Sequence, residues 1–253
     1  MEEQNGQPIA SPPGPLSFRE GEPNDLLTSG SPSLKERGPA PEGSREAARK
    51  AAPARLAILL SGRGSNMLAL VEAIETGVLR GVAEVAVVFS NDPAAPGLEA
   101  AAARGLPVAC LSSKGQPRAG FDHQVVALLQ SHHVDYVVLA GYLRVLSPDF
   151  VRAFAGRIVN IHPADTRLHQ GLHAYEWAFD NRRPETTITV HLVDEGLDTG
   201  PILAQQVVNL EGADTLAEVQ RRGLAVEHQL YPETLRQLIA ARHAAPDTAL
   251  THP

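Results

Sequence analysis

Apolar runs alternate with amphipathic stretches along most of this chain, beginning at Arg55. Short apolar runs that end at turn residues are typical of buried parallel strands, and they occur at 55–61, 83–90, 134–141 and 157–162. Between them, apolar residues recur at helical spacing over 67–74, 97–105 and 118–132. The alternation predicts βαβ units with right-handed crossovers, and therefore an α/β domain built on a parallel sheet.

The pattern changes toward the C-terminus. Residues 186–194 alternate between apolar and polar, and 200–210 follow closely, so the two segments are predicted to pair as a hairpin at the sheet edge. A last helix is predicted to begin near Asp214, a residue type favoured as an N-cap. Pro232 falls inside that helix and is expected to kink or restart it.

Composition separates the first 54 residues from the rest. They hold 9 of the 20 prolines and a single aromatic residue, Phe18. Such a segment cannot bury enough apolar surface to offset its ordering entropy. The sequence therefore predicts a disordered extension over 1–54, one folded domain over 55–245 and a flexible tail over 246–253.

The overall composition excludes several classes of protein. One cysteine, Cys110, rules out an intramolecular disulfide framework and a multi-cysteine zinc site. No apolar run approaches the roughly 20 residues of a membrane helix, and the N-terminus does not resemble a secretory signal. A net charge of −7 argues against nucleic acid as the main partner. We expect a cytoplasmic protein that binds small molecules, without a metal, nucleic acid or membrane partner.

The loop SGRGSN at 61–66 is the first candidate for chemistry. Gly62 and Gly64 allow a tight turn and close approach to a ligand, and the helix that follows offers free N–H groups suited to phosphate. Ser65 or Asn66 could add a side-chain donor. Met67 stands where a dinucleotide-binding motif has its third glycine, so a simple strand-to-helix turn remains an alternative.

Asn160 and His162 form the second candidate. They lie two residues apart on a predicted strand, so both side chains point to the same face. An amide donor beside an imidazole suits acyl transfer, because the donor stabilises an oxygen that becomes negative and the imidazole carries a proton for a leaving nitrogen. A histidine that only completes a strand end is an equally open interpretation.

The loop 193–201 is the third candidate and holds three acidic residues. Asp194 and Glu195 fit an ordinary solvated turn, whereas Asp198, followed by Thr-Gly-Pro, is expected at a fixed position. A carboxylate there could orient His162 and favour its protonated form.

Other polar residues carry weaker signals. Arg144 follows the strand 134–141 and could meet an anionic ligand or simply cap the structure. His169, His173 and His191 are dispersed along the chain, and none is predicted to bind a metal.

Taken together, seven stretches resemble the phosphoribosylglycinamide formyltransferase family. They are, in order, LLSGRGSN, VFSND, VVLAGYLRVLSP, RIVNIHP, GLHAYEWA, ITVHLVDEGLDTGPIL and EHQLYP. The order and spacing are more specific than any one stretch. The resemblance implies a single-domain formyltransferase fold with a Rossmann-like N-terminal half, helices on both faces of a mostly parallel twisted sheet, and an antiparallel hairpin toward the C-terminal part.

The resemblance also implies a reaction, which is formyl transfer from 10-formyltetrahydrofolate to the amine of glycinamide ribonucleotide in purine synthesis. Asn160 would bind the formyl oxygen, His162 would be the general acid, and Asp198 would support His162. The ribonucleotide would contact Gly64, Ser65, Asn66 and Glu227. The folate would contact Arg118, Leu143, Arg144, Val145, Leu146, Asn160, Asp194, Glu195, Gly196, Leu197 and Asp198. No metal is implied, and a homodimer stays open as the assembly.

One departure from the family lies close to these residues. The family has Ser-Leu-Leu-Pro and a further Pro-Gly after its Asn-Ile-His-Pro, whereas residues 164–171 here are Ala-Asp-Thr-Arg-Leu-His-Gln-Gly. The length is kept, the prolines are absent and charge is added, so substrate preference and loop mobility are left open.

Three other functions stay in view. A formyltetrahydrofolate deformylase would use the same kind of site with water as acceptor, but the proline-rich N-terminus does not resemble the regulatory domain of those hydrolases. A non-catalytic nucleotide-binding module would need only the 61–66 loop. A nicotinamide-dependent dehydrogenase is disfavoured by Met67 and by Asp92, which lies in a predicted turn.

Overall fold

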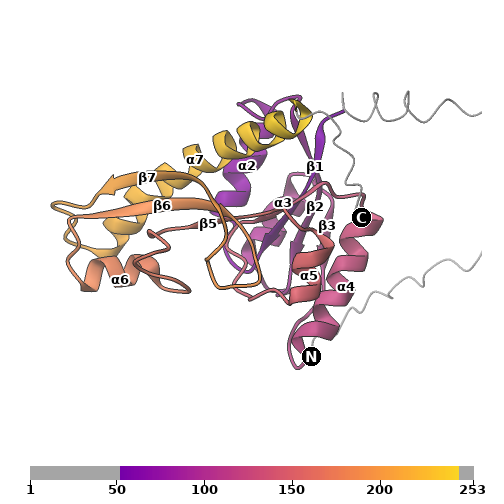
Figure 1. Ribbon diagram of the computed structural model, residues 1–253, viewed down its shortest axis with the longest axis horizontal. Coiled ribbons are helices and arrows are strands. Elements are labelled where there is room, and N and C mark those ends of the chain that lie inside the picture. Colours follow the sequence, from indigo (N-terminus) through magenta and orange to yellow (C-terminus); the bar gives the residue numbers. More distant parts are fainter. Residues whose placement is uncertain (1–51, 245–253) are drawn as a thin grey trace, which may run out of the picture. The chain divides into compact units, whose positions relative to one another are not determined.

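The computed structural model describes residues 52–244 (Figure 1). The first strand begins at Ala54, one residue from the predicted start of the folded domain. The predicted extension, apart from its last three residues, and the predicted tail at 246–253 lie outside the described residues.

Between residues 52 and 244 the strands form one sheet in the order β3-β2-β1-β4-β5-β6-β7. The pairs among β1 to β5 are parallel, and the β5–β6 and β6–β7 pairs are antiparallel. The strands are β1 Ala54–Leu60, β2 Ala83–Ser90, β3 Val108–Cys110, β4 Tyr136–Leu139, β5 Ile158–His162, β6 Glu185–Leu192 and β7 Ile202–Asn209. The prediction of a mostly parallel sheet with a hairpin at its edge is confirmed.

Helices cover both faces of this sheet, as the family resemblance implies (Figure 1). Alternate residues of β1 point to opposite faces: Leu56 and Ile58 pack with α2, α3 and α7, whereas Ala57 and Leu59 pack with α4 and α5. The helices are α2 Ser65–Glu75, α3 Pro96–Ala103, α4 Arg118–Ser131, α5 Pro148–Ala153, α6 Ala174–Asp180 and α7 Leu216–Ala244. The short helices α5 and α6 were not predicted, because 6 and 7 residues are too few to show a helical period.

The last helix differs from the prediction at two points. The N-cap is Thr215 rather than Asp214, since the Thr215 Oγ1 accepts a hydrogen bond from the Glu218 N–H at 3.2 Å. The helix also continues through Pro232 to Ala244 without restarting. Pro232 is buried, and its neighbours Tyr231 and Leu235 belong to the hydrophobic core, so tertiary packing compensates for the missing backbone hydrogen bond.

The strand order reverses direction between β1 and β4, and this reversal positions the site. Open parallel sheets bind ligands at such a point, outside the carboxyl ends of the strands. The segments that leave β1 and β4 are tied together there: the Ser61 N–H donates to the Gly141 carbonyl at 2.9 Å, and the Leu143 N–H donates to the Ser61 Oγ at 2.9 Å.

Candidate active site

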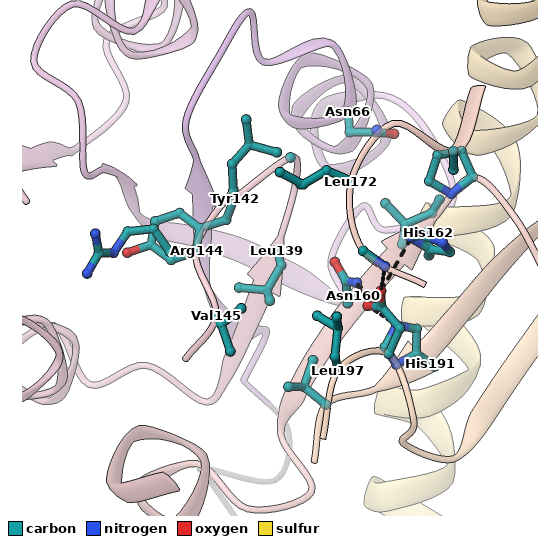
Figure 2. A pocket seen from close by; sticks show the side chains of 18 of the residues that line it. Asn66, Leu139, Tyr142, Arg144, Val145, Asn160, His162, Leu172, His191 and Leu197 are labelled. Carbon is teal, nitrogen blue, oxygen red and sulfur yellow. Dashed lines mark hydrogen bonds and ion pairs between the residues drawn. The ribbon is translucent and has the colours of Figure 1, made fainter. Parts of the chain in front are cut away.

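A pocket of about 640 Å³ lies at this reversal point and extends along β5 to the β6–β7 connection (Figure 2). Asn160 and His162 line one side, and Tyr142, Arg144 and Val145 lie across from them. Exposed apolar side chains rim the opening, namely Leu143, Val145, Leu172 and Leu197. Apolar surface left exposed around a pocket is typical of a ligand-binding site.

Asn160 and His162 both belong to β5 and both reach the pocket, as their spacing predicts. In the antiparallel pairing Asn160 stands opposite His191 of β6. The Asn160 Nδ2 lies 3.1 Å from the His191 Nε2 and donates to the Asp198 Oδ1 at 3.3 Å. Because the His191 Nδ1 donates to the Leu192 carbonyl at 2.9 Å, the His191 Nε2 is an acceptor in the neutral ring.

Asp198 joins these groups from the connection between β6 and β7. Its Oδ2 lies 3.7 Å from the His162 Nδ1, and its Oδ1 lies 3.5 Å from the His191 Nε2. The Gly171 N–H donates to the same Oδ2 at 2.8 Å. Asp198 has a φ of 52°, in the left-handed region where aspartate is tolerated better than most residues. This confirms the expectation of a fixed position for Asp198.

The surroundings lower the pKa of both His162 and Asp198, but for different reasons. Burial lowers the pKa of His162 and outweighs the raising influence of the Asp198 carboxylate. Burial alone would raise the pKa of Asp198, but the contact with the His191 ring, the hydrogen bond from the Gly171 N–H and the nearby His162 lower it overall. Asp198 thus favours the protonated form of His162, as expected, but burial has the larger effect, so the structure favours a neutral imidazole beside a charged carboxylate.

The atypical loop 164–171 contacts His162 directly. The His162 Nε2 donates to the His169 carbonyl at 3.0 Å, and the two imidazole rings are stacked at 6.1 Å between centroids. The Trp177 ring lies against the His169 ring, with 5.0 Å between the two centroids. A bidentate Asp165–Arg167 pair orders the start of the loop. The charged residues of this loop thus build a turn of their own.

The far end of the pocket holds a buried carboxylate. Glu227 of α7 is 4% exposed and accepts hydrogen bonds from the Asn66 Nδ2 and the Tyr175 hydroxyl. Asn66 and Glu227 are thus brought together, as the predicted ribonucleotide site requires. Gly64 and Ser65 form the N-terminus of α2 beside the pocket but are not among its lining residues.

Most of the predicted folate-binding residues line the pocket, and two of them do not. Those that line the pocket are Leu143, Arg144, Val145, Leu146, Asn160, Asp194, Gly196, Leu197 and Asp198. Arg118 is exposed at the first turn of α4 and is not among the lining residues, and Glu195 forms an ion pair with Arg152 at 2.8 Å. Asp194 also orders its own turn, since its Oδ1 accepts from Gly196 and Thr199. A role for Arg118 or Glu195 in binding stays a prediction.

Sequence reasoning missed five polar side chains that line the pocket, which are Arg63, Tyr142, His173, Tyr175 and His191. His191 could have been found only from the register between β5 and β6, because it faces Asn160 across the strand pair. Tyr175 lies on α6, a helix too short to be predicted.

Two further properties bear on the class of protein. Within residues 52–244 no group of three or more His, Cys, Asp or Glu side chains is arranged to hold a metal ion. Among the same residues no helix has the length and apolar character needed to cross a membrane.

Comparisons with known proteins give consistent matches. The family model described as formyl transferase matches residues 54–235. A phosphoribosylglycinamide formyltransferase of Escherichia coli is 36% identical over 178 residues, which are 70% of this chain and 83% of that protein. A crystal structure of the Bacillus halodurans phosphoribosylglycinamide formyltransferase is 41% identical, with a TM-score of 0.70, over 74% of this chain and 96% of that one.

A longer relative matches over the same region. The trifunctional purine biosynthetic protein adenosine-3 of Drosophila pseudoobscura is 38% identical over 185 residues, 73% of this chain. This chain spans only 14% of that relative's length.

Proposed function

The chain belongs to the formyl transferase family, and on that premise we propose that it transfers a formyl group from 10-formyltetrahydrofolate to the amine of glycinamide ribonucleotide. The observation that carries the proposal is one pocket with two chemically distinct ends. At one end Asn160, His162 and Asp198 meet, and at the other Asn66 and Glu227 present hydrogen-bonding groups beside the N-terminus of α2. The exposed apolar rim offers contact area for the flat ring system of a folate.

The proposed mechanism needs one proton to move from the amine to the folate nitrogen. The amine attacks the formyl carbon, and the carbonyl oxygen becomes negative in the tetrahedral intermediate. Asn160 would donate to that oxygen by exchanging its bond to Asp198, which at 3.3 Å is the longer of its two contacts. The bond from the formyl carbon to N10 then breaks as N10 receives a proton.

His162 would take this proton from the amine and then deliver it to N10. Its lowered pKa leaves the ring neutral at neutral pH, ready to accept a proton from the attacking amine. Because the Nδ1 faces Asp198, the Nε2 is the atom that exchanges the proton with substrate. To accept a proton there, the neutral ring must carry its own hydrogen on the Nδ1, toward Asp198, so the Nε2 gives up its bond to the His169 carbonyl. Asp198 would then hold the Nδ1–H and stabilise the imidazolium until N10 takes the proton.

A spectroscopic assay of formyl-folate consumption tests the proposal, run with and without glycinamide ribonucleotide. We expect turnover that depends on the ribonucleotide and that falls at least about a hundredfold in His162→Ala, the range typical of a lost acid–base group. His243→Ala, an exposed histidine at the end of α7, is the matched control. Formate release without the ribonucleotide would instead indicate a deformylase, and binding without turnover a nucleotide-binding module.

The proposal also concerns compartment and assembly. A cytoplasmic location fits the expected small-molecule substrates, and a homodimer remains a prediction that ultracentrifugation of the full chain would test.

A further inference from the structure

The buried Glu227 is held by two neutral donors, one on each carboxylate oxygen. The Asn66 Nδ2 from α2 donates to the Oε2, and the Tyr175 hydroxyl from α6 donates to the Oε1. A carboxylate offers about four lone-pair positions, so these two contacts leave acceptor capacity on both oxygens. A buried charge without full compensation is costly, which points to a ligand that completes the hydrogen bonding.

The uncommitted polar atoms of Asn66 and Glu227 are acceptors. The Asn66 amide has committed its nitrogen to Glu227, and its Oδ1 is buried without a hydrogen-bond partner among the described residues. Beside it stand the free positions of the Glu227 carboxylate. A matching ligand must therefore bring donors, and adjacent hydroxyl groups of a ribose are a class that does so.

Tyr175 reaches Glu227 only because Gly223 leaves room for its ring. Gly223 lies one turn before Glu227 on α7, and a Cβ built there would overlap the Tyr175 ring and hydroxyl. Glycine inside a helix is destabilising by about 0.5–1 kcal/mol relative to alanine. Its presence at this point has a packing reason, which is to let the Tyr175 side chain cross the face of α7.

We propose that Tyr175 is a positioning residue for substrate recognition: it fixes the orientation of the Glu227 carboxylate so that its free lone pairs face the hydroxyl groups of the ribonucleotide. This rests on the proposed function and assigns a role to a residue that sequence reasoning missed. Burial and the neighbouring carboxylate raise the pKa of Tyr175, so the hydroxyl stays a neutral donor over the whole working pH range.

Steady-state kinetics of Tyr175→Phe test this inference. The variant keeps the ring and removes the donor to a charged acceptor, so we expect the KM for the ribonucleotide to rise about tenfold. The kcat and the KM for the formyl folate should stay within about twofold, because the substitution is remote from the reacting atoms. Tyr136→Phe is the matched control, since Tyr136 is a buried tyrosine of β4 outside the pocket.

A double-variant cycle separates positioning from a merely structural role. If Tyr175 acts through Glu227, adding Tyr175→Phe to Glu227→Gln should raise the KM for the ribonucleotide little beyond Glu227→Gln alone. Gly223→Ala should reproduce the rise seen in Tyr175→Phe by displacing the ring. Equal losses of kcat and of affinity for both substrates, or independent effects in the double variant, would overturn the inference.

A binding measurement keeps this result separate from the proposed function. Calorimetric titration of glycinamide ribonucleotide into each variant reports affinity without turnover. Tighter binding to the unaltered chain than to Tyr175→Phe, with no formyl transfer by either, would refute the proposed reaction and support the role of Tyr175. Transfer at full rate with equal affinity in both would do the reverse.

Discussion

Replacing Asp198 by asparagine changes one charge at the centre of the site and little of its shape. The asparagine oxygen can still accept from the Gly171 N–H, which now lies 2.8 Å from the Asp198 Oδ2. What is lost is the negative charge 3.7 Å from the His162 Nδ1. The substitution therefore isolates the electrostatic support of His162 from the geometry of the loop.

The 3.7 Å between the Asp198 Oδ2 and the His162 Nδ1 sets the expected loss of turnover. At an effective dielectric constant of about 20, unit charges at this separation attract by about 4 kcal/mol. The attraction exists only while His162 carries the transferred proton, so it stabilises the reaction path and not the resting state. We expect kcat to fall by about a thousandfold, with Asp149→Asn, an exposed carboxylate paired to Arg152, as a control for loss of charge alone.

The pH profile of kcat checks the reasoning independently of its size. Because Asp198 raises the pKa of His162 against the lowering influence of burial, Asp198→Asn should move the acidic limb of the profile to lower pH. Turnover within threefold of the unaltered chain would refute the role of Asp198. An acidic limb that moved to higher pH would show that the limb does not report His162.

Three further predictions concern stability. From a fully buried position the Tyr231 hydroxyl contacts the carbonyl of Leu139 at the end of β4 and that of Val159 near the start of β5. Tyr231→Phe should therefore cost about 1–3 kcal/mol in urea unfolding, and a change below about 0.5 kcal/mol would contradict this. Thr215→Ala should cost about 1 kcal/mol as the loss of an N-cap, whereas Asp214→Ala should leave the melting temperature nearly unchanged. Burial raises the pKa of Tyr142 and Tyr175 above 10.0. Above about pH 10 the unfolded chain therefore holds fewer protons than the folded one, so the folded state should lose stability as the pH rises. A urea midpoint that does not change between about pH 9 and 11 would contradict this prediction.

The sequence predicted the parallel strands well because each is a short apolar run with clear turn residues after it. The strand 83–90 is identical in prediction and structure. Errors fall where local signals compete with tertiary packing. Pro232 predicts a break when α7 is considered alone, but the helix is packed along the sheet over its length. At the start of α7 both Asp214 and the capping signal Thr-x-x-Glu at Thr215 are present, and the structure uses Thr215.

The site could be predicted as far as its residues lie on one strand or in one motif. Asn160 and His162 share a face through strand periodicity alone, so their pairing followed from spacing. His191 is 31 residues away from Asn160, and only the register of two antiparallel strands brings them into contact. The link between Tyr175 and Glu227 depends on the crossing of two helices, for which the sequence carries no periodic signal.

The protonation states of a neutral His162 imidazole and an ionised Asp198 carboxylate explain how one residue can serve as base and then as acid. If His162 were protonated at rest, it could not accept the proton of the attacking amine, and burial prevents this by lowering its pKa. If Asp198 were protonated, the imidazolium would have no counter-charge, and the contacts with the His191 ring and the Gly171 N–H prevent that by lowering the pKa of Asp198. The ion pair between His162 and Asp198 thus forms only when the imidazole takes the proton of the attacking amine. Its energy is therefore gained along the reaction path and not in the resting state.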